Sequence, residues 1–196
     1  MASPAAQALP TPHSPPRPAV PSGRLAVWWF LGSEVVTFGG LLVAYSLMRL
    51  RHPEWGEQAA NTLMWAGTLN TVVLLTSSLT MVLAHVAAEA GDHRKAARRL
   101  AITTLLGLAF VGVKAFEYSH EIHAGFTPVA GLFWSFYFVM TGLHALHVLG
   151  GLVANFIVWL GVRKGKALQR VELVGLYWHF VDVVWIFLFP LLYVAS

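Results

Sequence analysis

Long apolar runs alternate with short polar segments along most of this chain. Each run has the ~20 residues that a helix needs to cross ~30 Å of hydrocarbon, and each is too long for a strand. The pattern predicts helices at about 25–50, 61–88, 100–118, 132–162 and 173–195. The predicted fold class is therefore all-α, a polytopic membrane bundle of five transmembrane helices, with 25–196 as one membrane domain.

The composition agrees with a membrane protein. Of the 196 residues, 57% are hydrophobic and only 11% are charged, which leaves no room for a separate water-soluble domain. The net charge of +4 does not predict a nucleic-acid partner, because the cations lie between the apolar runs. The chain has no cysteine, which excludes disulfides, thiolate metal sites and iron–sulfur clusters.

The first 24 residues form a region of their own. They hold seven of the ten prolines and no apolar stretch, so we expect a disordered, proline-rich tail. A secretory signal peptide needs an apolar core of 7–15 residues, which this segment lacks. We therefore expect the first apolar run to remain as a membrane helix.

The cations between the spans predict an orientation. The tail and the second and fourth connections carry nearly all the loop lysines and arginines, namely Arg17, Arg24, Arg94, Lys95, Arg98, Arg99, Arg163, Lys164, Lys166 and Arg170. The other side has only Arg49 and Arg51. The positive-inside rule then predicts a cytoplasmic N-terminus and a C-terminus outside, in a multi-pass protein of the plasma membrane.

Three charged residues interrupt the apolar runs: Glu34, Lys114 and Asp182. A charge facing lipid costs about 2.5–3.5 kcal/mol or more at mid-helix, so we expect them to face the protein interior or a partner. Lys114 and Glu117 stand three residues apart, a spacing that favours an ion pair within one helix.

Three histidines complete the intramembrane polar set. His144 and His147 are about one helical turn apart, and His179 shares a side of its helix with Asp182. Counting residues from the helix ends places Glu34, His179 and Asp182 in one layer. The same count places His144 near Lys114 and Glu117 in a second, outer layer.

These polar residues are open to two interpretations. They could form a metal site or a proton relay, since histidine and carboxylate serve both. They could equally hydrogen-bond one helix to another. Structural pairing is favoured because the residues are spread over four helices, so no metal site is predicted. No phosphate loop, nucleophile elbow or zinc-protease motif is present, and no catalytic residue is predicted.

Several segments carry a family resemblance. They are Phe30–Glu34, Asn70–Ser78, Phe116–Tyr118, Thr141–Val148 and Tyr177–Trp185. In this order they resemble the third to seventh helices of subunit III of haem–copper terminal oxidases. The resemblance runs from about residue 25 to the end of the chain. The sequence resembles a short, five-helix form of the family that lacks its first two helices.

This resemblance implies a non-catalytic subunit that stabilises subunit I of a bacterial respiratory oxidase by direct contact, with subunit II, other oxidase subunits and membrane lipids as further partners. Haem and copper would lie in subunit I, with no cofactor in this chain. Glu34 matches the family's buried third-helix carboxylate and would support proton uptake, whereas His144, His147, His179 and Asp182 match positions that pack and hydrogen-bond. In long forms the first two helices enclose lipid together with the other five. We therefore expect bound phospholipid in this chain only if a partner supplies the missing wall.

Two other functions stay open at this stage. Lys114 stands where glutamine is common in the family, which could mark a relative associated with nitric oxide reductase. A stand-alone transporter or metal carrier using the intramembrane histidines is a third hypothesis, although no two-half repeat of interrupted helices supports it. The electron donor, cytochrome c or quinol, is likewise open.

Overall fold

A computed structural model describes residues 22–194 of the chain. Its elements are helices α1 (Ser22–Arg51), α2 (Trp55–Ala59), α3 (Met64–Glu89), α4 (His93–His123), α5 (Leu132–Arg163) and α6 (Arg170–Phe189), followed by a π-helical turn, η1 (Pro190–Val194). Five of these segments are long and apolar enough to cross a membrane, since η1 continues α6. The described part of the chain contains no strand, so the predicted all-α class with five spans is confirmed.

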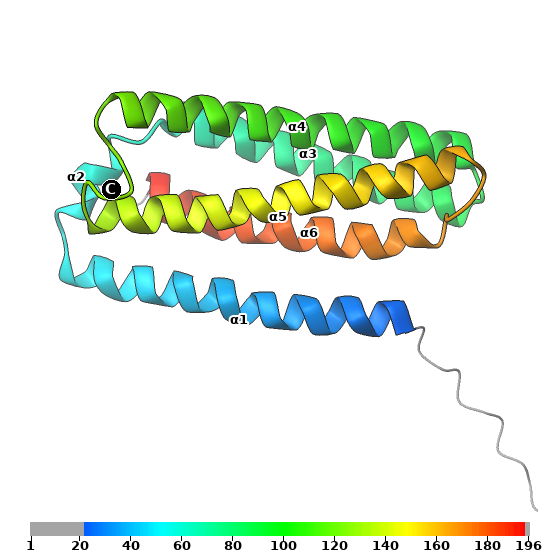
Figure 1. Cartoon of the computed structure of the whole chain (residues 1–196), viewed down its shortest axis with the longest axis horizontal. Helices are drawn as coiled ribbons and strands as arrows, with labels where there is room; N and C mark the ends of the chain where they lie inside the picture. Colours follow the sequence, from blue (N-terminus) through cyan, green and yellow to red (C-terminus); the bar gives the residue numbers. More distant parts are fainter. Residues whose placement is uncertain (1–21, 195–196) are drawn as a thin grey trace, which may run out of the picture.

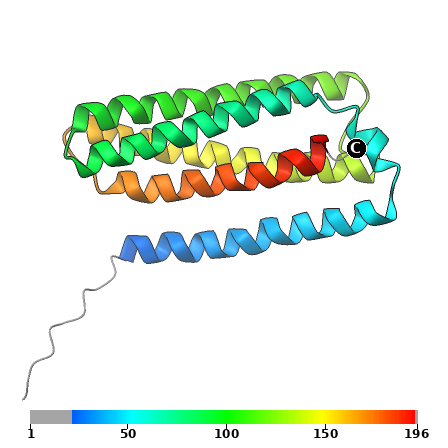
Figure 2. The same ribbon diagram turned by 180° about the vertical axis from the view of Figure 1, so that it is seen from behind.

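The long helices lie side by side along one axis (Figures 1 and 2). Helix α3 packs on α4 and α6, and α5 packs on the same two helices, so α3 to α6 form a four-helix bundle. Helix α1 lies along the outside of this bundle, where it contacts α6 and, less extensively, α5. A large part of α1 is therefore open to lipid or to another protein.

The two ends of the bundle differ in charge. The start of α1, the α3–α4 turn and the α5–α6 connection share one end, as Figure 1 shows. This end, called the basic end below, carries every described lysine and arginine except Arg49, Arg51 and Lys114. Helix α2, the α4–α5 connection and η1 lie at the opposite end. Which end faces the cytoplasm remains a prediction.

Helix α4 is longer than the predicted range of 100–118, because it starts at His93 and continues to His123. The backbone N–H of Lys95 donates to the side chain of Asp92 at 3.0 Å, a standard N-cap that starts the helix inside the predicted loop. This hydrogen bond, with the Lys95 ammonium nearby, lowers the pKa of the Asp92 carboxyl below its ordinary value. The apolar run therefore covers only the middle part of α4.

Glycines stop two of the long helices where the chain must reverse. Gly91 and Gly125 have φ angles of 71° and 89°, a left-handed conformation that side chains disfavour. After Gly91, the backbone N–H of Asp92 donates to the carbonyl of Ala87 at 2.9 Å, which satisfies an end carbonyl of α3. Helices α3 and α4 can thus form a tight antiparallel hairpin.

Two predicted boundaries meet the edges of the described residues. The predicted tail, 1–24, lies outside them except for residues 22–24, which belong to α1. The predicted end of the last helix at residue 195 also lies outside. Short helix α2 was not predicted; its Trp55 is buried and packs on Tyr45 at a ring-centroid distance of 5.4 Å.

Candidate functional site

Glu34 and His147 join α1 to α5. His147 Nε2 lies 3.1 Å from Glu34 Oε2, and His147 Nδ1 lies 2.9 Å from the carbonyl oxygen of Leu143. A carbonyl only accepts, so Nδ1 carries a hydrogen, and the Glu34 contact needs a second hydrogen on either partner. The pair therefore holds one proton, as an imidazolium–carboxylate or as a neutral imidazole with a carboxylic acid.

The packing around this pair keeps it largely away from solvent or lipid. The side chains of His147 and Glu34 are only 14% and 16% exposed. Phe38 of α1 meets the His147 ring edge-on at a centroid distance of 5.1 Å, and the Tyr177 hydroxyl of α6 donates to the His147 carbonyl at 2.9 Å. Three helices thus contribute to a shielded acid–base pair.

His144 does not join His147, although both lie on α5. Its ring lies between Phe110 of α4, at a centroid distance of 5.5 Å, and Trp185 of α6, at 5.2 Å. Neither ring nitrogen of His144 has a hydrogen-bond partner within residues 22–194. The same part of the chain contains no group of three metal-ligating side chains close enough to hold an ion.

His179 and Asp182 are only loosely associated. His179 Nδ1 lies 2.8 Å from the Ser78 hydroxyl of α3 but 3.9 Å from Asp182 Oδ2. The Asp182 side chain is 5% exposed, whereas that of His179 is 36% exposed. The sequence grouped Glu34, His179 and Asp182 by depth alone. In the structure Glu34 pairs with His147, and His179 pairs with Ser78.

Lys114 and Glu117 form the ion pair that their spacing predicted, with Lys114 Nζ 3.1 Å from Glu117 Oε2. Both side chains are almost fully buried, at 3% and 0% exposure. Lys114 Nζ also donates to the hydroxyls of Tyr137 and Tyr193, at 2.9 and 2.5 Å. These tyrosine contacts were not predicted from the sequence.

Glu121 is the fifth member of this cluster, which we call the tyrosine–carboxyl network: Lys114, Glu117, Glu121, Tyr137 and Tyr193. The Tyr137 hydroxyl lies 2.7 Å from Glu117 Oε1 and 2.8 Å from Glu121 Oε1, and the Tyr193 hydroxyl donates to Glu117 Oε1 at 2.6 Å. Glu121 was missed because the predicted helix ended at 118. Its spacing of four residues from Glu117 and seven from Lys114 could have placed it on their face.

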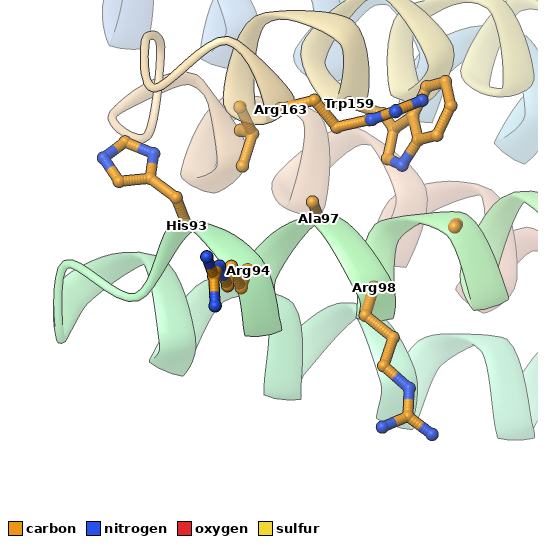
Figure 3. Close-up of a pocket in the computed structure, with 8 residues that line it drawn as sticks. His93, Arg94, Ala97, Arg98, Trp159 and Arg163 are labelled. Carbon is orange, nitrogen blue, oxygen red and sulfur yellow. The ribbon is translucent and has the colours of Figure 1, made fainter.

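A groove between α4 and α5 lies at the basic end and has a volume of about 400 Å³. It is lined by His93, Arg94, Ala97, Arg98, Ala101, Trp159, Val162 and Arg163. Figure 3 shows Trp159 and Arg163 on the α5 wall, with Arg98 extending away from α5. The Arg163 guanidinium lies 4.7 Å from the centre of the Trp159 ring. The lining contains three arginines and no acidic residue.

Comparisons with known proteins give a consistent result. The family model described as cytochrome c oxidase subunit III matches residues 17–196. The chain is 36% identical over 172 residues to cytochrome c oxidase subunit 3 of Thermostichus vulcanus, which covers 85% of this chain and 84% of that protein. It is 34% identical over 196 residues to cytochrome c oxidase subunit 3 of Bacillus sp. (strain PS3), covering 94% and 93%.

One relative is a fusion. The haem–copper oxidase subunit I+III of Aeropyrum pernix is 32% identical to the chain over 183 residues, covering 88% of this chain and 22% of that protein. The family match and the names of these relatives support the subunit III interpretation. They give no support to a nitric-oxide-reductase-associated protein or to a stand-alone transporter.

Proposed function

Because the chain belongs to the cytochrome c oxidase subunit III family, we propose that it stabilises subunit I of a respiratory haem–copper oxidase and supports proton uptake there through Glu34. The role as a subunit III in such an oxidase follows from the family. Haem and copper belong to subunit I in this proposal, and this chain supplies no catalytic group.

The shielded Glu34–His147 pair carries the proposal. Its single shared proton can move between an acid and a base only 3.1 Å apart. The pair also ties α1, which packs loosely, to the bundle. Loss of the pair would therefore affect both the seating of α1 and the protonation of this region.

Glu34→Gln in the intact oxidase complex tests the role. The variant keeps the shape of the side chain but cannot form a carboxylate, so we expect assembled complex whose activity declines faster over repeated turnovers. Ser33→Ala is the matched control, because Ser33 is exposed and its hydroxyl donates to the carbonyl of Phe30 in its own helix. Unchanged assembly together with unchanged sustained activity would remove Glu34 from the proposal.

The α3–α6 side of the bundle is the surface assigned to subunit I. His179 is 36% exposed within a membrane span, and polar groups facing lipid are costly. A protein partner would cover His179 and Ser78; Figure 2 views the side on which α3 and α6 lie. The Aeropyrum pernix fusion, in which both subunits share a chain, is compatible with direct contact.

Photocrosslinking can test this surface. A photoreactive residue at Leu79, beside Ser78 on α3, should form an adduct with subunit I in the purified complex. Leu105 on α4 serves as the control, because it is similarly exposed, at 65% against 58% for Leu79. Adducts at Leu105 and none at Leu79 would contradict the assignment of the α3–α6 side to subunit I.

An anionic phospholipid headgroup is the proposed occupant of the α4–α5 groove. Within residues 22–194, Arg94 and Arg163 have no carboxylate partner, and His93 Nδ1 is buried without a hydrogen bond. A phosphate would satisfy these donors at the level of the membrane surface. Native mass spectrometry should show less phosphatidylglycerol retained by Arg94→Gln/Arg163→Gln than by wild type or the loop control Lys164→Gln. Equal retention in all three would rule out this occupant.

A further inference from the structure

The tyrosine–carboxyl network contains one more negative group than its single cation can balance. Lys114 is the only cation within it, while Glu117 and Glu121 are both fully buried. A second ionised carboxylate without a counter-ion in such a site is very unfavourable. The network therefore has reason to hold an extra proton.

The hydrogen bonds of Tyr137 require a proton on one of the two glutamates. The Tyr137 hydroxyl has one hydrogen to donate, yet it lies within 2.8 Å of an oxygen on each of two carboxyl groups. If both carboxyls were ionised, one of these short oxygen–oxygen contacts would contain no hydrogen. A proton on Glu117 or on Glu121 would remove the conflict.

Glu117 is the ionised member of the two. Its Oε1 accepts from Tyr193 at 2.6 Å and its Oε2 lies 3.1 Å from Lys114 Nζ, so a charge there is well balanced. Glu121 has a single hydrogen-bond contact, to Tyr137, and no ion pair joins its carboxyl to a cation within residues 22–194. Protonating Glu117 instead would leave Lys114 without a counter-ion.

We propose that Glu121 and Tyr137 form a buried proton-binding site near the end of the bundle opposite the basic end, separate from the Glu34–His147 pair. Glu121 carries the proton and donates it to the Tyr137 hydroxyl. Tyr137 accepts from Lys114 as well and donates to Glu117, and Tyr193 donates to Glu117. Each hydroxyl hydrogen then has one acceptor, and the network is neutral.

Within the described residues, the charged groups that act on the Glu121 carboxyl are Lys114 and Glu117, and both are already counted. On α4 the neighbouring Tyr118 bonds to Thr141 of α5 at 2.7 Å, and on α6 the nearest ring is Trp185, 5.9 Å from Lys114 Nζ. His144 packs against the Trp185 ring, and neither of its ring nitrogens bonds to the network. Glu121 stands two residues before the end of α4, so its proton lies close to the water-facing end of the helix.

Infrared difference spectroscopy on the purified oxidase complex tests this site directly. The spectrum of the wild type minus that of Glu121→Gln should show the C=O stretch of one protonated carboxyl. This band shifts to lower frequency in D₂O if the proton exchanges with solvent. Loss of a carboxylate stretch in place of that band would overturn the proposal. Glu57→Gln, at an exposed position on α2, is the control and should lose a carboxylate stretch.

A second measurement compares the two glutamates in assembly. Glutamine at position 121 can donate an amide hydrogen to Tyr137, so Glu121→Gln should retain the subunit in the complex at the wild-type level. Glutamine at position 117 removes the counter-ion of Lys114, so Glu117→Gln should lose the subunit on purification. Equal loss in both variants, or loss only in Glu121→Gln, would overturn the assignment of the proton to Glu121.

Discussion

Gly107 of α4 lies directly against the indole ring of Trp178 of α6. A Cβ atom at position 107 would stand 2.7 Å from Trp178 Cη2 and 2.7 Å from Leu152 Cδ2 of α5. Three helices therefore meet at a point where only a hydrogen atom fits. This contact sets how closely α4 can approach α5 and α6, and with it the position of the polar clusters at either side.

Gly107→Ala should destabilise the bundle by about 1–3 kcal/mol, because an inserted methyl group forces large rings out of place. The measurement is the temperature at which the purified complex releases this subunit. Gly112→Ala is the matched control on the same helix, since nothing lies within 4 Å of its added Cβ. Equal release temperatures for the two variants would show that position 107 can take a methyl group without displacing Trp178 or Leu152.

Ser77 and Trp178 support a second prediction. The buried Trp178 indole N–H donates to the Ser77 hydroxyl at 3.0 Å, linking α6 to α3. Ser77→Ala leaves this N–H without its acceptor, at a cost of about 1–3 kcal/mol. Thr76→Ala, at an exposed position whose hydroxyl bonds to Val72 in its own helix, should have little effect on the same release temperature. An equal effect of both substitutions would contradict the assigned bond.

The sequence predicted the helices well and their mutual rotation poorly. Lys114 and Glu117 were paired correctly because both lie within one turn of one helix. Glu34 and His147 are 113 positions apart, and their contact depends on which face each helix turns to the other. Depth estimates carry no such information, so the sequence predicted a layer for Glu34 but no partner.

Helix length caused the other omission. The apolar run ended the predicted helix 100–118 too early, because α4 continues to His123, and this left Glu121 outside the predicted helix. Tyr137 and Tyr193 lie 16 and 72 positions from Glu121, on other elements, and tyrosines in an apolar run carry no distinctive pattern. Such a network becomes visible only when α4, α5 and η1 are placed together.

The Asp92 N-cap gives a pH-dependent prediction. Since folding lowers the pKa of Asp92, its stabilisation of the α4 start is present above the ordinary carboxyl pKa and is lost as the pH falls through the lowered value. In acid the α3–α4 turn should become more sensitive to pepsin. Asp92→Asn should reduce the acid-dependent part of this change, because its amide cannot titrate. Identical pH profiles for variant and wild type would exclude Asp92 as the titrating group.

The orientation predicted from the cations can be tested with the same chain, because it contains no cysteine of its own. Lys166→Cys places a thiol in the α5–α6 connection at the basic end, and Val129→Cys places one at a 92% exposed position in the α4–α5 connection. If lysines and arginines face the cytoplasm, a membrane-impermeant maleimide added to intact cells should label position 129 and should label position 166 only after the membrane is opened. The reverse labelling pattern would show the opposite orientation of the protein. The proton-binding site at Glu121 would then lie toward the cytoplasmic side and not the outer side.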